Sequence, residues 1–87
     1  MTTKPPPSVK EFPSESWEKI AYESARSIPA QEPNDLNRLG YHVWQWLVHR
    51  EGTLAEAITI SGSRMEISHE EALKIISENL RKRGIQL

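Results

Sequence analysis

Apolar residues recur at helical spacing in the stretch LNRLGYHVWQWLVHREG, which covers residues 36–52. With about 100° of rotation per residue, four of them share one face of a helix: Leu36, Leu39, Val43 and Leu47. The opposite arc is polar. We therefore predict a helix that follows Pro33-Asn34-Asp35, which supplies a turn and an N-cap oxygen, and whose end is marked by a left-handed residue at Gly52.

The apolar arc of this helix is wider than one neighbouring helix can cover. Trp46 and Trp44 flank the stripe on its two sides, and Tyr41 and Val48 extend it past half the circumference on the Trp44 side. Either two or three helices surround the helix, or part of it meets a partner. We predict a partner-binding surface formed by Tyr41, Trp44 and Val48, because a tyrosine ring with its polar tip suits an interface.

A second apolar stripe precedes this helix. Its members recur at i, i+3, i+4, i+7 and i+11: Trp17, Ile20, Ala21, Ser24 and Ile28. The pattern predicts a helix that begins at Ser14 and is stopped by Pro29. The linker over residues 29–34 is short, so the two helices should pack antiparallel.

A short helix over residues 54–60 is predicted next, because Thr53 and Glu56 have the spacing of a capping box. The alternation of isoleucine and methionine with polar residues in 58–67 also fits a small hairpin turning at Ser61 and Gly62. We favour the short helix followed by a loop, since a serine- and glycine-rich stretch interrupts the pattern.

The last predicted helix covers residues 69–83. Ser68 and Glu71 again have the spacing of a capping box, and Gly84 is placed to end the helix in a Schellman motif with a contact from Ile85. The apolar end of the chain either packs on the core or pairs as an edge strand. Three basic residues load the last turn, where positive charge suits the helix dipole: Arg81, Lys82 and Arg83.

Together these elements predict an all-α fold, a small three- to four-helix bundle in one domain over residues 14–87. Three long helices and one short one are expected to pack around residues 36–51. Residues 1–13 are predicted to be a flexible Pro-rich arm, because Pro5, Pro6 and Pro7 favour polyproline II. About 70 folded residues bury only about 60% of their unfolded surface, so association into a homodimer would be a natural supplement.

Composition excludes several classes of function. The chain has 11 basic and 12 acidic residues among 87 and a net charge of −1, which gives no general attraction to nucleic acid or anionic membrane. It has no cysteine, which excludes disulfides and thiolate chemistry. No apolar run suits a signal peptide or a membrane span, so we expect a cytoplasmic protein without membrane contact.

The three histidines do not suggest a metal or catalytic site. His42 and His49 share a helix face but lie seven residues apart, about 10 Å along the axis, whereas metal ligands on a helix usually lie three or four residues apart. No spacing suggests a nucleophile oriented by a base, and no Gly-rich phosphate loop is present. We therefore expect that the protein is not an enzyme and that it has no cofactor and no small-molecule substrate.

The helix order offers an alternative. Residues 36–87 are predicted to form a long helix, then a short capped helix, and then a longer capped helix that ends in Arg-Gly-Ile. This order resembles the three-helix core of helix-turn-helix and winged-helix domains. The resemblance implies nucleic-acid binding, with Arg81, Lys82 and Arg83 as the phosphate contacts. Two features depart from it: the connection over residues 61–67 is about twice the usual three to four residues, and the last helix begins with histidine and two glutamates.

Size, balanced charge and the lack of a catalytic pattern favour a different class. We expect a non-enzymatic protein-interaction or regulatory module that binds a protein partner or a second copy of itself. Nucleic-acid binding is the second hypothesis.

Overall fold

The computed structural model describes residues 17–87, so the predicted arm over residues 1–13 and the predicted helix start at Ser14 lie outside the described residues. Four helices follow in order: α1 Trp17–Ala25, α2 Pro33–His49, α3 Leu54–Ser61 and α4 His69–Lys82. Within the described part of the chain the only strand-like pairing is one isolated bridge. The predicted all-α class and small helical bundle are confirmed.

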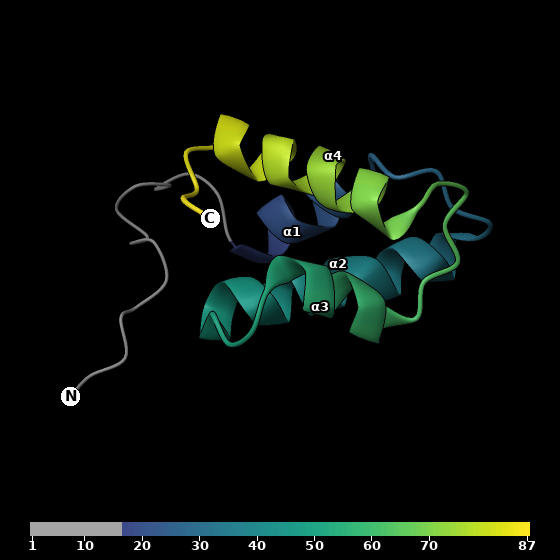
Figure 1. Cartoon of the computed structure of the whole chain (residues 1–87), viewed down its shortest axis with the longest axis horizontal. Coiled ribbons are helices and arrows are strands. Elements are labelled where there is room, and N and C mark those ends of the chain that lie inside the picture. Colours follow the sequence, from purple (N-terminus) through teal and green to yellow (C-terminus); the bar gives the residue numbers. More distant parts are fainter. Residues whose placement is uncertain (1–16) are drawn as a thin grey trace.

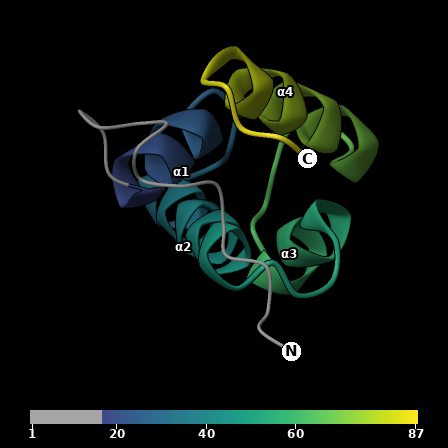
Figure 2. The same cartoon turned by 90° about the vertical axis from the view of Figure 1, so that its left-hand side faces the viewer.

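The helices form a four-membered ring (Figures 1 and 2). Helix α2 packs against α1 and α3, and α4 packs against α3 and α1, while the diagonal pairs α1–α3 and α2–α4 face each other across the core without close backbone approach. Helix α2 is therefore one side of the ring. This corrects the expectation that the other elements pack around it: α1 and α3 each cover one flank of its stripe, and α4 completes the ring opposite.

The interior of the ring is filled by aliphatic side chains from every helix. Its largest fully buried apolar members are at most 2% exposed: Ile20, Ile28, Leu39, Val43, Leu47, Ile58, Ile76, Leu80 and Ile85. The predicted stripe of α2 is confirmed at its three inner positions, while Leu36 is half-buried and packs at the edge of the core.

The predicted capping box of α3 is complete, whereas at α4 only the Ser68 half of the predicted box is present. Thr53 and Glu56 form a complete capping box: the Glu56 amide donates to Thr53 Oγ1 at 3.1 Å, and the Thr53 amide donates to Glu56 Oε1 at 2.8 Å. At α4 the Glu71 amide donates to Ser68 Oγ at 3.1 Å. These bonds satisfy amides that have no partner within the helix.

The end of α4 is a Schellman motif, as predicted. The Ile85 amide donates to the Leu80 carbonyl at 3.0 Å and the Gly84 amide to the Arg81 carbonyl at 2.8 Å. Gly84 has a φ of 85°, the left-handed conformation that glycine adopts without strain. Of the apolar end, Ile85 is buried on the core, whereas Gln86 and Leu87 are exposed, and none of the three pairs as a strand.

The two ends of α2 differ from the prediction. The helix begins at Pro33 after Glu32, which provides no side-chain cap, and Asp35 lies inside the first turn. Proline suits the first helical position because it lacks the amide hydrogen that would be unsatisfied there. The left-handed residue that ends the helix is Arg50, with φ 53°, and Gly52 is left-handed two residues later.

Contacts on both sides of Arg50 hold this uncommon conformation. Its guanidinium lies 4.7 Å from the centroid of the Trp46 ring, and its Nη2 donates to the Gln86 carbonyl at 2.7 Å. The first contact is a cation–π interaction, and the second connects α2 to the end of the chain.

Asp35 is a buried carboxylate that joins α2 to the connection between α3 and α4. Its side chain has no exposed surface. Oδ1 accepts from the Arg64 amide at 3.2 Å and from Arg38 Nη2, and Oδ2 lies 3.5 Å from Arg64 Nε. The Ser63 hydroxyl donates to the Asp35 carbonyl. We call these four residues the Asp35 clasp.

The loops beside the clasp pair through their backbones at one end of the ring (Figure 1, right). Ala30 and Met65 form an antiparallel bridge. The Glu66 amide donates to the Pro29 carbonyl at 2.8 Å, and the Gln31 amide to the Arg64 carbonyl at 3.3 Å. Met65 therefore pairs with the distant α1–α2 loop, and the alternative hairpin within residues 58–67 is wrong; the short helix followed by a loop is confirmed.

The clasp sets the charge state of Asp35. Burial alone would raise the pKa of its carboxyl group, but the hydrogen bond from the Arg64 amide and the positive charges of Arg64 and Arg38 outweigh burial. Its pKa therefore lies below the usual value of 3.8. A lowered pKa in the folded state means that the ionised group stabilises the fold above that usual value and loses this effect as the pH falls through the folded pKa.

We expect Asp35→Asn to lower the melting temperature at pH 7, because the neutral amide loses the attraction of the two arginines. The difference from wild type should shrink as the pH falls below 3.8 toward about 2. Thermal melts followed by circular dichroism measure both effects. Glu32→Gln is the control, because it removes only the exposed 3.2 Å ion pair with Arg64 and should cost less than about 1 kcal/mol. A difference independent of pH would contradict the assignment.

Candidate interaction surface

The predicted partner-binding residues lie on one outward face of α2. Tyr41 is 46% exposed, and Trp44 and Val48 are half-buried. The Tyr41 and Trp44 rings are in contact, with centroids 5.7 Å apart and planes inclined at 55°. Val48 follows Trp44 by four residues and therefore lies on the same helix face. We call these three residues the α2 face; binding there remains a prediction.

Polar neighbours adjoin the α2 face. Gln45 Nε2 donates to the Tyr41 hydroxyl at 3.3 Å, and the ring of His42 meets the Tyr41 ring edge-on, with centroids 5.4 Å apart. The α2 face itself carries no charged side chain. An aromatic pair beside polar groups is the composition that protein interfaces favour.

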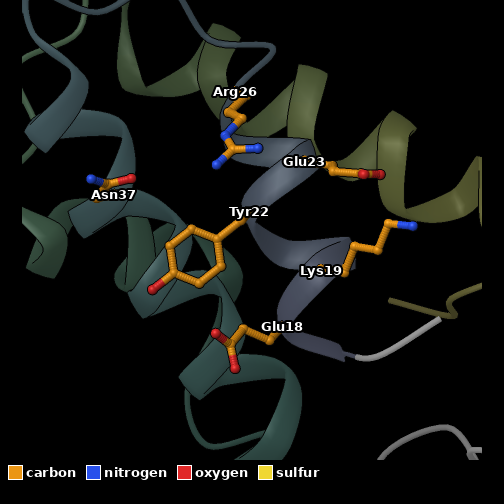
Figure 3. Close-up of a pocket in the computed structure, with 6 residues that line it drawn as sticks. All are labelled: Glu18, Lys19, Tyr22, Glu23, Arg26 and Asn37. Carbon is orange, nitrogen blue, oxygen red and sulfur yellow. The ribbon is translucent and has the colours of Figure 1, made fainter.

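An open hollow of about 660 Å³ lies beside α2 on the outer surface of α1 (Figure 3). Its lining is mostly polar and charged: Glu18, Lys19, Tyr22, Glu23, Arg26 and Asn37. The Tyr22 ring extends from α1 over α2, as the close-up shows. The sequence prediction did not include this side chain.

Tyr22 sets the close approach of α1 to α2. A Cβ atom placed on Gly40 would lie 2.5 Å from Cδ1 of the Tyr22 ring, which no real structure tolerates. The ring therefore packs directly on the backbone of α2. A glycine inside the apolar arc of a helix is the sequence signal for such an approach, but nothing in the sequence says which side chain fills it.

The C-terminal basic cluster is divided in the structure. Arg81 and Lys82 are exposed at the end of α4, whereas Arg83 is partly buried and forms an ion pair with Glu23 of α1. The other end of α4 exposes Glu70 and Glu71. Only part of the predicted phosphate-contact set is therefore free of the α1–α4 interface.

Residues 17–87 hold little other chemistry. No group of three or more histidine, aspartate or glutamate side chains there is arranged to hold a metal ion. His69 Nδ1 lies 3.5 Å from the Thr59 hydroxyl. From Trp17 onward, none of the helices has both the length and the apolar character needed to cross a membrane.

No protein-family model, curated protein or solved structure matches the chain. Its function is therefore inferred from its own residues.

Gly40→Ala should test the contact with Tyr22. In an open helix position this change would stabilise by about 1 kcal/mol, but overpacking against the ring typically costs about 1–3 kcal/mol. We expect a net loss of stability in urea unfolding. In a Tyr22→Ala background the same change should stabilise, because the obstructing ring is gone. The same effect in both backgrounds would contradict the contact.

Proposed function

We propose that this protein is a non-enzymatic, cytoplasmic protein-interaction module whose contact surface is the α2 face, and that a second copy of the chain occupies this face. The observation that carries the proposal is the exposed Tyr41 ring in contact with the half-buried Trp44 ring. Aromatic residues are enriched and charged residues are depleted at the centres of interfaces.

The arrangement of the face suits a two-fold dimer. Tyr41 lies three residues before Trp44, and Val48 lies four residues after it. If two copies of α2 pack antiparallel with the axis near Trp44, each large Tyr41 ring meets the smaller Val48 side chain of the other copy. A two-fold interface needs such a self-complementary surface.

The size of the fold also favours self-association. Small domains gain relatively little stability from one apolar core. A dimer would cover the aromatic pair and leave the polar Gln45 at the rim, where it can bond to water or to the other copy.

Replacing Tyr41 and Val48 together should separate binding from folding. We expect wild type to show concentration-dependent dimers in sedimentation velocity and light scattering, and the double variant Tyr41→Ser, Val48→Ser to remain monomeric. Its far-UV circular dichroism and monomer melting should stay close to wild type. A wild-type chain that is monomeric at about 1 mM, where even a weak dimer would be populated, would contradict the homodimer.

Two controls make the comparison specific. Ile60→Ser changes the most exposed large apolar residue within residues 17–87, 68% exposed on α3, and should leave dimerisation unchanged. Leu47→Ala removes a fully buried side chain and should cost about 2–5 kcal/mol. A double variant that melts like Leu47→Ala would show that Tyr41 and Val48 belong to the core, and the proposal would fail.

The nucleic-acid hypothesis predicts a different result. Binding through Arg81 and Lys82 would weaken steeply as salt rises. We expect no affinity for duplex DNA beyond nonspecific levels, about 10⁻⁴–10⁻⁶ M at physiological salt, because Glu70 and Glu71 are exposed at the start of the same helix. Sequence-selective binding lost in Arg81→Ala would overturn the interaction proposal.

A further inference from the structure

The hollow between α1 and α2 is continuous with the α2 face. Asn37, which lines the hollow, precedes Tyr41 by four residues and therefore lies on the same side of α2. On α1, the Tyr22 ring lies between Arg26 and Glu18 along the hollow (Figure 3). Interface cores pack as densely as protein interiors, so in a dimer formed through the α2 face the second copy should fill this hollow.

The two-fold arrangement determines which part of the second copy reaches the hollow. In the proposed dimer, Tyr41 of one copy meets Val48 of the other. Because the two α2 helices are antiparallel, each step toward the start of one is a step toward the end of the other. Asn37 lies four residues before Tyr41, so it faces the fourth residue after Val48 of the second copy, which is Gly52. The hollow therefore faces the turn over residues 50–53, which connects α2 to α3.

This turn is fixed in shape and largely exposed. Glu51, Gly52 and Thr53 are exposed. Trp46 Nε1 donates to the Gly52 carbonyl at 3.3 Å, and the capping box of Thr53 holds the far side of the turn. Gly52 carries no side chain, so the backbone here can approach another surface closely. A preorganised segment of this kind loses little conformational entropy when it binds.

Arg26 provides a positive charge at the matching end of the hollow. It is exposed, and no ion pair joins it to another residue within 17–87. The short connection makes α1 and α2 antiparallel, and Tyr22 lies against Gly40. Arg26 follows Tyr22 by four residues and therefore lies toward the start of α2, the end of the hollow that faces the turn of the second copy.

Glu51 provides a negative charge on the turn. It is exposed, and it too forms no ion pair within the described part of the chain. Its neighbour Arg50 is already held by the Trp46 ring and the Gln86 carbonyl. Opposite charges on two surfaces that meet fix their register, whereas like charges at the same place oppose association.

On the basis of the proposed function, a dimer through the α2 face, we propose that the hollow between α1 and α2 receives the α2–α3 turn of the second copy. Arg26 of each copy pairs with Glu51 of the other. Two-fold symmetry makes this pair occur twice in the dimer. The aromatic α2 face supplies most of the affinity, and the two ion pairs specify the antiparallel register.

Charge reversal tests the pair. In sedimentation velocity at low salt, Arg26→Glu and Glu51→Arg should each raise the dimer Kd about tenfold or more, because each places like charges together twice. An equimolar mixture of the two variants should form a heterodimer about as tight as wild type, since both of its pairs then join opposite charges. Melting of each monomer should stay close to wild type, because both residues are exposed.

Two double variants separate the pair from net charge. Arg26→Glu with Glu51→Arg keeps the net charge of −1 and restores opposite charges, so it should dimerise as wild type does. Arg26→Glu with Glu78→Arg is the matched control with the same net charge. Because Glu78 is exposed on α4 and does not line the hollow, this variant should remain weak. Equal recovery in both double variants would show general charge attraction and overturn the proposal.

The results distinguish the ion pair from the dimer itself. A monomeric wild type overturns both the pair and the proposed function. If Tyr41→Ser, Val48→Ser abolishes the dimer but neither charge reversal weakens it, the α2 face is supported and the pair is overturned. Weakening by both reversals without recovery in their mixture also overturns the pair, because the two charges then act separately.

Discussion

The buried carboxylate of Asp35 is the constraint on which the ring arrangement depends. Helices α2 and α4 lie diagonally across the ring and meet only through the core, so close backbone packing between them does not fix where the α3–α4 connection lies. Asp35 does so by accepting from the Arg64 amide and from Arg38. Both arginine side chains are at least half exposed, so water solvates their charges while the carboxylate remains compensated inside.

The opposite end of the ring is closed by a comparable set of polar contacts. Arg50 connects the end of α2 to the carbonyl of Gln86, and Arg83 connects α4 to Glu23 of α1. The aliphatic interior lies between these two polar ends. An apolar core is tolerant of how helices slide against each other, whereas hydrogen-bonded ion pairs require one geometry, so the polar ends specify the register that the core alone would leave open.

Features that depend on neighbouring residues could be predicted from the sequence, and features that depend on distant ones could not. Spacings of three and four residues predict the capping residues and the buried stripe. The same spacings predict that Tyr41, Trp44 and Val48 share one helix face. Asp35 lies in the segment that was predicted to cap the helix, and its partner Arg64, 29 residues away, could not be identified from local spacing. The contact of Tyr22 with Gly40 could not be predicted either. A glycine in a helix indicates that a neighbouring group packs close to the backbone, but it does not identify that group.

The ring also has a consequence for how the chain folds. Three of its four helix contacts join elements adjacent in sequence, and only the contact of α1 with α4 joins the two ends of the described chain. Topologies rich in local contacts have low contact order and fold rapidly, since little loop-closure entropy opposes each step. Among the four helix contacts, docking of α4 onto α1 closes the longest loop, so it should limit the rate at which the native state appears.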